Sequence, residues 1–116
     1  MESQTTILTR RILLYLRALG HPAWRQNTVG VRGRTIEKES RGIADIVWIE
    51  KSTGRHCEIE IKQGKDELNQ AQIDHRSAVL KANGAHWEIR SFREFESLIK
   101  DLTTQQQFAI LKRQND

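Results

Sequence analysis

The chain has 116 residues, a size that fits one domain. It is 37% apolar and 29% charged, with one Pro and seven Gly, which excludes a linker, a collagen and a low-complexity chain. No apolar stretch approaches the roughly 20 residues that a membrane-spanning helix needs, and no signal peptide is visible. A single cysteine, Cys57, excludes an internal disulfide and a Cys-based zinc cluster. We expect a small soluble domain located in the cytoplasm.

The net charge of +4 comes from the first 44 residues. They carry eight Lys and Arg against three acids, whereas the rest of the chain carries eleven against twelve. Much of the excess lies in a segment over 30–42 that several Gly residues interrupt. Such a segment is either a solvated basic loop or an arm that holds phosphates, and charge alone leaves both alternatives open.

The first predicted element is an amphipathic helix over 6–19, in which apolar residues recur at helical spacing. The Gly-His-Pro sequence at 20–22 ends it. A short strand over 24–29 precedes the basic segment. The β-branched and aromatic residues over 43–49 then predict a second strand.

The next strand, over 56–62, follows a turn at 51–54 and alternates along its length. One side carries the apolar residues Cys57, Ile59 and Ile61, and the other carries Glu58, Glu60 and Lys62. We expect Cys57 to be a buried, inert thiol. The chain's four histidines, which show no ligand spacing, are expected to be ordinary surface or core residues: His21, His56, His75 and His86.

A helix is predicted to begin after Asn69, because Asn69 and Gln72 resemble a capping box. It ends at Asn83-Gly84, where Gly would supply a left-handed cap. Alternating apolar residues predict a strand over 85–89.

A last helix opens at Ser91 and runs to residue 102. We expect one domain over 1–102 and a tail over 103–116 that forms a short helix at most. The helix between the strands at 56–62 and 85–89 predicts a crossover between parallel strands. The expected fold class is therefore α/β, a small mixed sheet flanked by helices.

If the strands over 43–49 and 56–62 form a regular hairpin, two carboxylates lie opposite each other across it. With the turn centred between Ser52 and Thr53, Asp45 faces Glu60, and directly opposed like charges are destabilising. A divalent cation between them, held as Mg²⁺ is by one or two carboxylates, would make this pairing tolerable. The alternative is that Glu58, Glu60 and Lys62 form the solvated face of an edge strand. A register shift of one residue would also separate the carboxylates.

These residues resemble a VRR-NUC domain, a branch of the PD-(D/E)XK nuclease superfamily. The resemblance consists of Asp45 after a Gly-x-x step that begins at Gly42, Glu60-Ile61-Lys62 on the next strand, and Gln72 at the start of the following helix. It extends over the chain to about residue 102. It implies a restriction-endonuclease-like fold with an αβββαβ core.

The resemblance also implies roles for these side chains. Asp45 and Glu60 would bind Mg²⁺ or Mn²⁺ together with the main-chain carbonyl of Ile61, and Glu2 would add a ligand. Lys62 would position the attacking water or neutralise the phosphate. Gln72 would orient Lys62, a phosphate or a water, in addition to or instead of capping its helix.

By resemblance, the expected activity is that of a metal-dependent DNA endonuclease of phage or bacterial type that resolves four-way (Holliday) junctions as a homodimer. The residues expected to contact DNA lie in and before the basic segment: Arg25, Asn27, Arg32, Arg34, Lys38 and Arg41. Two alternatives stay open. One is a nuclease that acts on duplex or flap DNA in nicking, packaging or restriction, and the other is a non-catalytic DNA-binding module.

Overall fold

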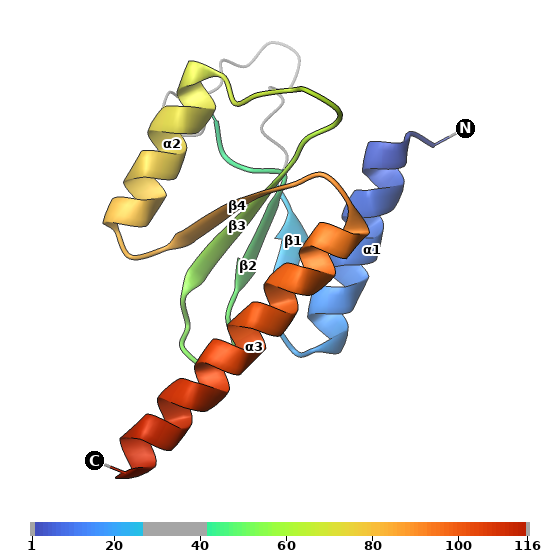
Figure 1. The fold of residues 1–116 in the computed structure, drawn as a ribbon. Coiled ribbons are helices and arrows are strands. Elements are labelled where there is room, and N and C mark those ends of the chain that lie inside the picture. Colours follow the sequence, from blue (N-terminus) through green and yellow to red (C-terminus); the bar gives the residue numbers. More distant parts are fainter. Residues whose placement is uncertain (1, 27–41, 116) are drawn as a thin grey trace.

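The protein is described by a computed structural model that covers residues 2–26 and 42–115, with side chains to residue 103. Its elements, in chain order, are α1 (Gln4–Ala18), β1 (Ala23–Arg25), β2 (Ile46–Ile49), β3 (His56–Ile61), α2 (Gln70–Lys81), β4 (Ala85–Ile89) and α3 (Phe92–Asn115). The four strands form one mixed sheet between the helices (Figure 1). The predicted α/β fold class is confirmed.

The sheet has the strand order β1-β2-β3-β4, so β3 lies between two neighbours. β2 and β3 pair antiparallel with Trp48 opposite Cys57 and Ile46 opposite Ile59, which is the register predicted from the turn. β4 pairs with β3 in parallel, and α2 forms the predicted crossover. The hypothesis of a solvated edge strand at 56–62 is wrong, because β4 covers the second edge of β3.

The two faces of the sheet have different neighbours. One face packs against α1 and α3 through an apolar core that includes Ile12, Leu16, Ile59 and Phe95, all of them fully buried. The other face is covered in part by α2, which packs against β4 and buries Val79. Figure 1 shows α2 on the side of the sheet opposite to α3. Glu58 and Glu60 lie on the α2 face, because they alternate with the core residues of β3.

The last helix is longer than the sequence predicts. The residues expected to form a separate tail after residue 102 continue α3 to Asn115, and this half of α3 extends beyond the sheet (Figure 1). Despite its length, neither α3 nor any other described helix is apolar enough to cross a membrane. The strand predicted over 24–29 is β1 at Ala23–Arg25, and 27–41 lie outside the described residues.

The end of α2 differs from the prediction in one residue. The left-handed residue is Asn83, with φ of 69°, and not Gly84. Asn tolerates this conformation better than most side chains do. Gly84 is required for another reason, because a Cβ there would lie 2.7 Å from Val79 Cγ1.

Gly42 brings the chain before β2 into contact with the first turn of α2. Its φ is +78°, and a Cβ at this position would overlap the backbone carbonyl of Ala71. Only a residue without a side chain allows this approach. The Gly-x-x-Asp spacing therefore has a structural cause: Gly42 places the segment that carries Asp45 against the helix that carries Gln72.

We predict that Gly42→Ala destabilises the fold by about 3 kcal/mol or more, because it adds backbone strain and a clash with immovable backbone. Gly54→Ala is the matched control. Gly54 has a similar φ of 75°, but no atom lies within 4 Å of the added Cβ, so this variant should cost about 1 kcal/mol. Urea unfolding of both variants measures the difference, and equal losses would contradict the close approach at Ala71.

Candidate functional site

Two acidic residues meet where β2 begins and β3 ends. Asp45 immediately precedes β2, and its Oδ2 accepts a hydrogen bond of 2.8 Å from the backbone N–H of Ile61. Glu60 is on β3 and is only 5% exposed. The structure therefore places Asp45 near Glu60, as the hairpin register predicts, and the contact with Ile61 is made by its N–H and not by the carbonyl that the resemblance implies as a ligand.

Glu60 is held in an environment that opposes its ionisation. Burial, and next the negative charge of Asp45, raise the pKa of Glu60 to about 8. Its Oε1 accepts a hydrogen bond of 3.1 Å from Gln72 Nε2. Its Oε2 is buried and has no hydrogen-bond donor. A buried carboxylate oxygen without a donor, close to a second carboxylate, is a position that a cation would stabilise.

Gln72 links the helix α2 to the strand β3. Its Oε1 accepts hydrogen bonds from Lys62 Nζ at 3.1 Å and from the backbone N–H of Asn69 at 2.9 Å. Asn69 Oδ1 in turn accepts from the Gln72 N–H, which completes the predicted capping box. Gln72 therefore caps α2 and also contacts Lys62, one of the groups that it was expected to orient, together with Glu60.

The donor set fits Mg²⁺ or Mn²⁺ better than zinc. Hard cations bind carboxylate and carbonyl oxygens, and Mg²⁺ commonly takes one or two carboxylates and completes its shell with water and phosphate oxygens. Asp45 and Glu60 supply such a pair. In the described part of the chain, no group of three or more His, Cys, Asp or Glu side chains is arranged to hold a metal. A zinc site, which needs at least three such ligands, does not fit here.

Other predicted site residues lie apart from this cluster or outside the described residues. Glu2 is exposed, forms an ion pair with Arg10, and does not complete a three-ligand group with Asp45 and Glu60. Arg25 is exposed on β1. The remaining residues predicted to contact DNA lie within 27–41, outside the described residues: Asn27, Arg32, Arg34, Lys38 and Arg41.

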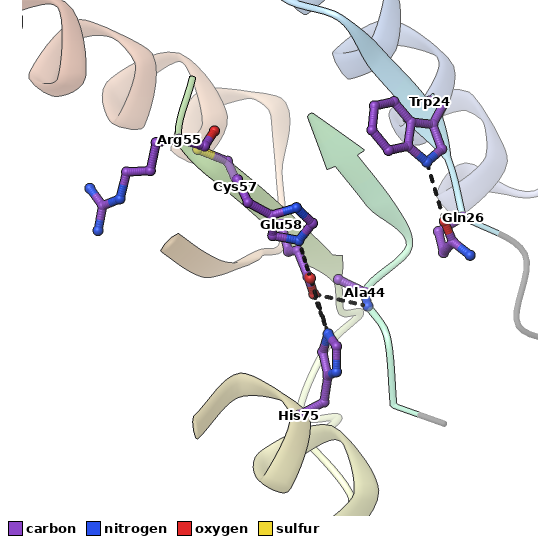
Figure 2. A network of polar contacts seen from close by, with 8 residues as sticks. Trp24, Gln26, Ala44, Arg55, Cys57, Glu58 and His75 are labelled. Carbon is purple, nitrogen blue, oxygen red and sulfur yellow. Dashed lines mark hydrogen bonds and ion pairs between the residues drawn. The ribbon is translucent and has the colours of Figure 1, made fainter. Parts of the chain in front are cut away.

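A second carboxylate on the same face, Glu58, lies in a network that the sequence did not predict (Figure 2). It is 1% exposed. Its carboxylate accepts hydrogen bonds from His56 Nε2 at 2.6 Å and from His75 Nε2 at 2.9 Å, and one oxygen lies 3.5 Å from the Ala44 N–H. Burial raises the pKa of Glu58, but the two histidine hydrogen bonds outweigh it and hold this pKa below its usual range.

Helical spacing in the sequence could have indicated that His75 faces the sheet. It follows Gln72 by three residues, so both side chains lie on one face of α2. The expectation that His56 and His75 are ordinary residues missed this contact because ligand spacing along the chain says nothing about pairing between a helix and a strand. Cys57 is buried as predicted, and burial raises the pKa of its thiol to about 11.

We predict that Glu60→Gln makes the metal-free protein less sensitive to alkaline pH. The folded pKa of Glu60, about 8, lies above its ordinary value of 4.5. The neutral carboxyl of Glu60 therefore contributes to stability in full below about pH 4.5, and this contribution is lost as the pH rises through about 8. In EDTA, wild type should lose about 4 kcal/mol relative to Glu60→Gln between pH 5 and 9.

Urea unfolding across this pH range is the measurement. Glu88→Gln is the control, because Glu88 is exposed on β4 directly beside Glu60. It should keep the pH dependence of wild type. Parallel pH profiles for wild type and Glu60→Gln would contradict the raised pKa.

No family model, curated protein or solved structure matches the chain. Inference about function therefore depends on the geometry of these side chains and on the motif in which they occur.

Proposed function

We propose that the protein is a divalent-metal-dependent endonuclease that hydrolyses phosphodiester bonds in DNA. One observation carries the proposal: Asp45, Glu60, Lys62 and Gln72 converge from the start of β2, the end of β3 and the first turn of α2. Two carboxylates can hold the divalent metal that assists phosphate hydrolysis, and an ammonium and an amide can stabilise the phosphate and orient the water.

Each side chain has a position suited to its role. A Mg²⁺ or Mn²⁺ ion bound by Asp45 and Glu60, with the carbonyl of Ile61, would polarise the phosphate and lower the pKa of a water molecule. Lys62 would neutralise charge that develops on the phosphate or hold the attacking water. Gln72 keeps the Lys62 ammonium near Glu60 by bonding to both. This pre-organisation leaves Lys62 two further N–H donors for the substrate.

The carboxylate pair favours an enzyme over a simple DNA-binding module. Asp45 and Glu60 repel phosphate, so a surface that only binds DNA gains nothing from placing them together. With a cation bound, the same pair attracts a phosphate oxygen and directs chemistry to it. A binding module also has no need of the Gln72 bridge to Lys62.

We also propose branched DNA, above all the four-way junction, as substrate and a homodimer as the active form. Both follow from the resemblance to VRR-NUC nucleases. One domain with one carboxylate pair cuts one strand at a time. Paired cuts across a symmetric junction therefore require two copies related by a twofold axis.

We predict that Lys62→Ala lowers the single-turnover cleavage rate by about 100-fold or more and leaves the fold intact. The assay compares a labelled four-way junction with its linear duplex arms, with Mg²⁺ and with EDTA. Lys65→Ala is the matched control, because Lys65 is exposed three residues further along the same connection. It should lose at most a phosphate contact.

The outcomes separate the three functions considered. Metal-dependent paired cuts on the junction, lost in Lys62→Ala, support a resolvase. Equal cleavage of junction and duplex keeps the nuclease and rejects junction selectivity. DNA binding without cleavage in either Mg²⁺ or Mn²⁺, or cleavage that EDTA leaves unchanged, would refute the proposed mechanism.

A further inference from the structure

Trp24 on β1 is an exposed aromatic side chain held in a defined orientation. It is 41% exposed, whereas Trp48 is 1% exposed and Trp87 stacks on Trp48 with ring centroids 6.1 Å apart. The indole N–H of Trp24 donates a hydrogen bond of 3.2 Å to Gln26 Oε1 (Figure 2). Because this bond satisfies the polar edge of the ring, the surface left for a ligand is mostly aromatic carbon.

Trp24 lies on the same face of the sheet as the carboxylates. It pairs with Val47, and Val47 pairs with Glu58, so these three side chains point to one face. The ladder continues past β1, where the Gln26 N–H donates to the Asp45 carbonyl at 2.8 Å. The Trp24–Gln26 pair therefore runs alongside the site. From strand spacings, Trp24 and Glu60 are about 12 Å apart along the sheet.

On this face α2 lies toward β4, and Trp24 on β1 is 41% exposed. α2 packs against β4 and covers the β3 side of the face, where Glu58 and Glu60 are buried. β1 is an edge strand of three residues in which Trp24 is exposed on this face, whereas the exposed Arg25 alternates to the opposite face. A strand of nucleic acid entering the site from this side would meet the Trp24 ring.

We propose that Trp24, oriented by Gln26, is a stacking platform for an unpaired nucleobase of the strand bound at Asp45, Glu60 and Lys62. The location of that strand rests on the proposed function, but the stacking itself does not. Every nucleobase offers a π face, and an aromatic ring beside a phosphate-binding group is a recurring arrangement for single strands. Bases within a duplex are already stacked on both sides, so the platform selects unpaired or distorted positions.

The surroundings of Trp24 favour a base over a protein partner. Its hydrogen-bond partner Gln26 is polar, and the other large exposed apolar residues described lie on α1, at its end, or on α2. Protein interfaces need a cluster of apolar anchors, whereas one ring is enough for one base. The net charge of +4 also suits a polyanion.

Intrinsic fluorescence can test the platform, because Trp24 is the most exposed of the three tryptophans. The full chain in EDTA is titrated with oligodeoxythymidine of about 12 nucleotides, a length within the usual range of single-strand sites. We expect quenching that Trp24→Phe removes and Trp87→Phe retains. Trp24→Ala should weaken binding by about 5- to 100-fold. Leu80→Ala, at a comparably exposed residue on α2, should not.

A second comparison uses only the wild type and so does not depend on the folding of a variant. An abasic oligonucleotide of the same length keeps the phosphates and removes the bases. We expect it to bind more weakly than oligodeoxythymidine by the factor that Trp24→Ala costs, and to bind wild type and Trp24→Ala equally. Equal affinity of wild type for the two oligonucleotides, or loss of abasic binding in Trp24→Ala, would overturn the platform.

The platform and the nuclease can fail separately. Junction cleavage in Mg²⁺ by wild type and Trp24→Ala alike, without quenching by oligodeoxythymidine, would refute the platform and keep the nuclease. Quenching that depends on Trp24, without cleavage of any DNA, would keep the platform as a single-strand-binding site and refute the nuclease. The molecular mass of the protein in solution is the third readout. If wild type has twice the mass of Trp24→Ala and oligodeoxythymidine does not quench its fluorescence, the ring belongs to a contact between two copies and the platform is overturned.

Discussion

The structure depends on the burial of two carboxylates on the central strand of its sheet. Glu58 and Glu60 are both within 5% of full burial, because β3 has neighbours on both edges and α2 lies across this face. Burying an ionisable group is costly unless it gains partners. The helix above therefore must supply donors, and it does so with His75 for Glu58 and Gln72 for Glu60.

The two carboxylates are two residues apart and have opposite electrostatic environments. Glu58 accepts hydrogen bonds from two histidines, which hold its pKa low, and nothing in its surroundings requires a further ligand. Burial, and next the charge of Asp45, raise the pKa of Glu60, and one of its oxygens has no hydrogen-bond donor. Pairs of acids whose environments separate their pKa values are typical of functional sites. The contrast supports a structural role for Glu58 and the proposed metal-binding role for Glu60.

The face of the sheet that carries these acids is covered by α2 on its β4 side and has an exposed side chain, Trp24, at its β1 edge. Gly42 allows the chain before β2 to approach the first turn of α2, which covers the side that contains the Gln72–Lys62 bridge. At the edge strand β1, Trp24 on the same face is 41% exposed. The proposed chemistry and the proposed base contact therefore lie on the same face of the sheet.

The sequence by itself determined the local structure and the pairing of neighbouring strands. The turn at 51–54 set the register that places Asp45 near Glu60, and the capping box at Asn69 set the start of α2. These features depend on residues close together in the chain, so local patterns predict them. The sequence also supplied the motif that suggests a nuclease.

Only the tertiary structure decided what surrounds those residues. Because β4 pairs with β3, β3 has neighbours on both edges, and Glu58 is buried and not solvated as the edge-strand alternative implied. The parallel crossover placed His75 and Gln72 over the sheet, and the same packing left Trp24 uncovered. Such contacts join segments far apart in the chain, and their energies come from burial and desolvation, which depend on the whole fold and not on spacing along the sequence.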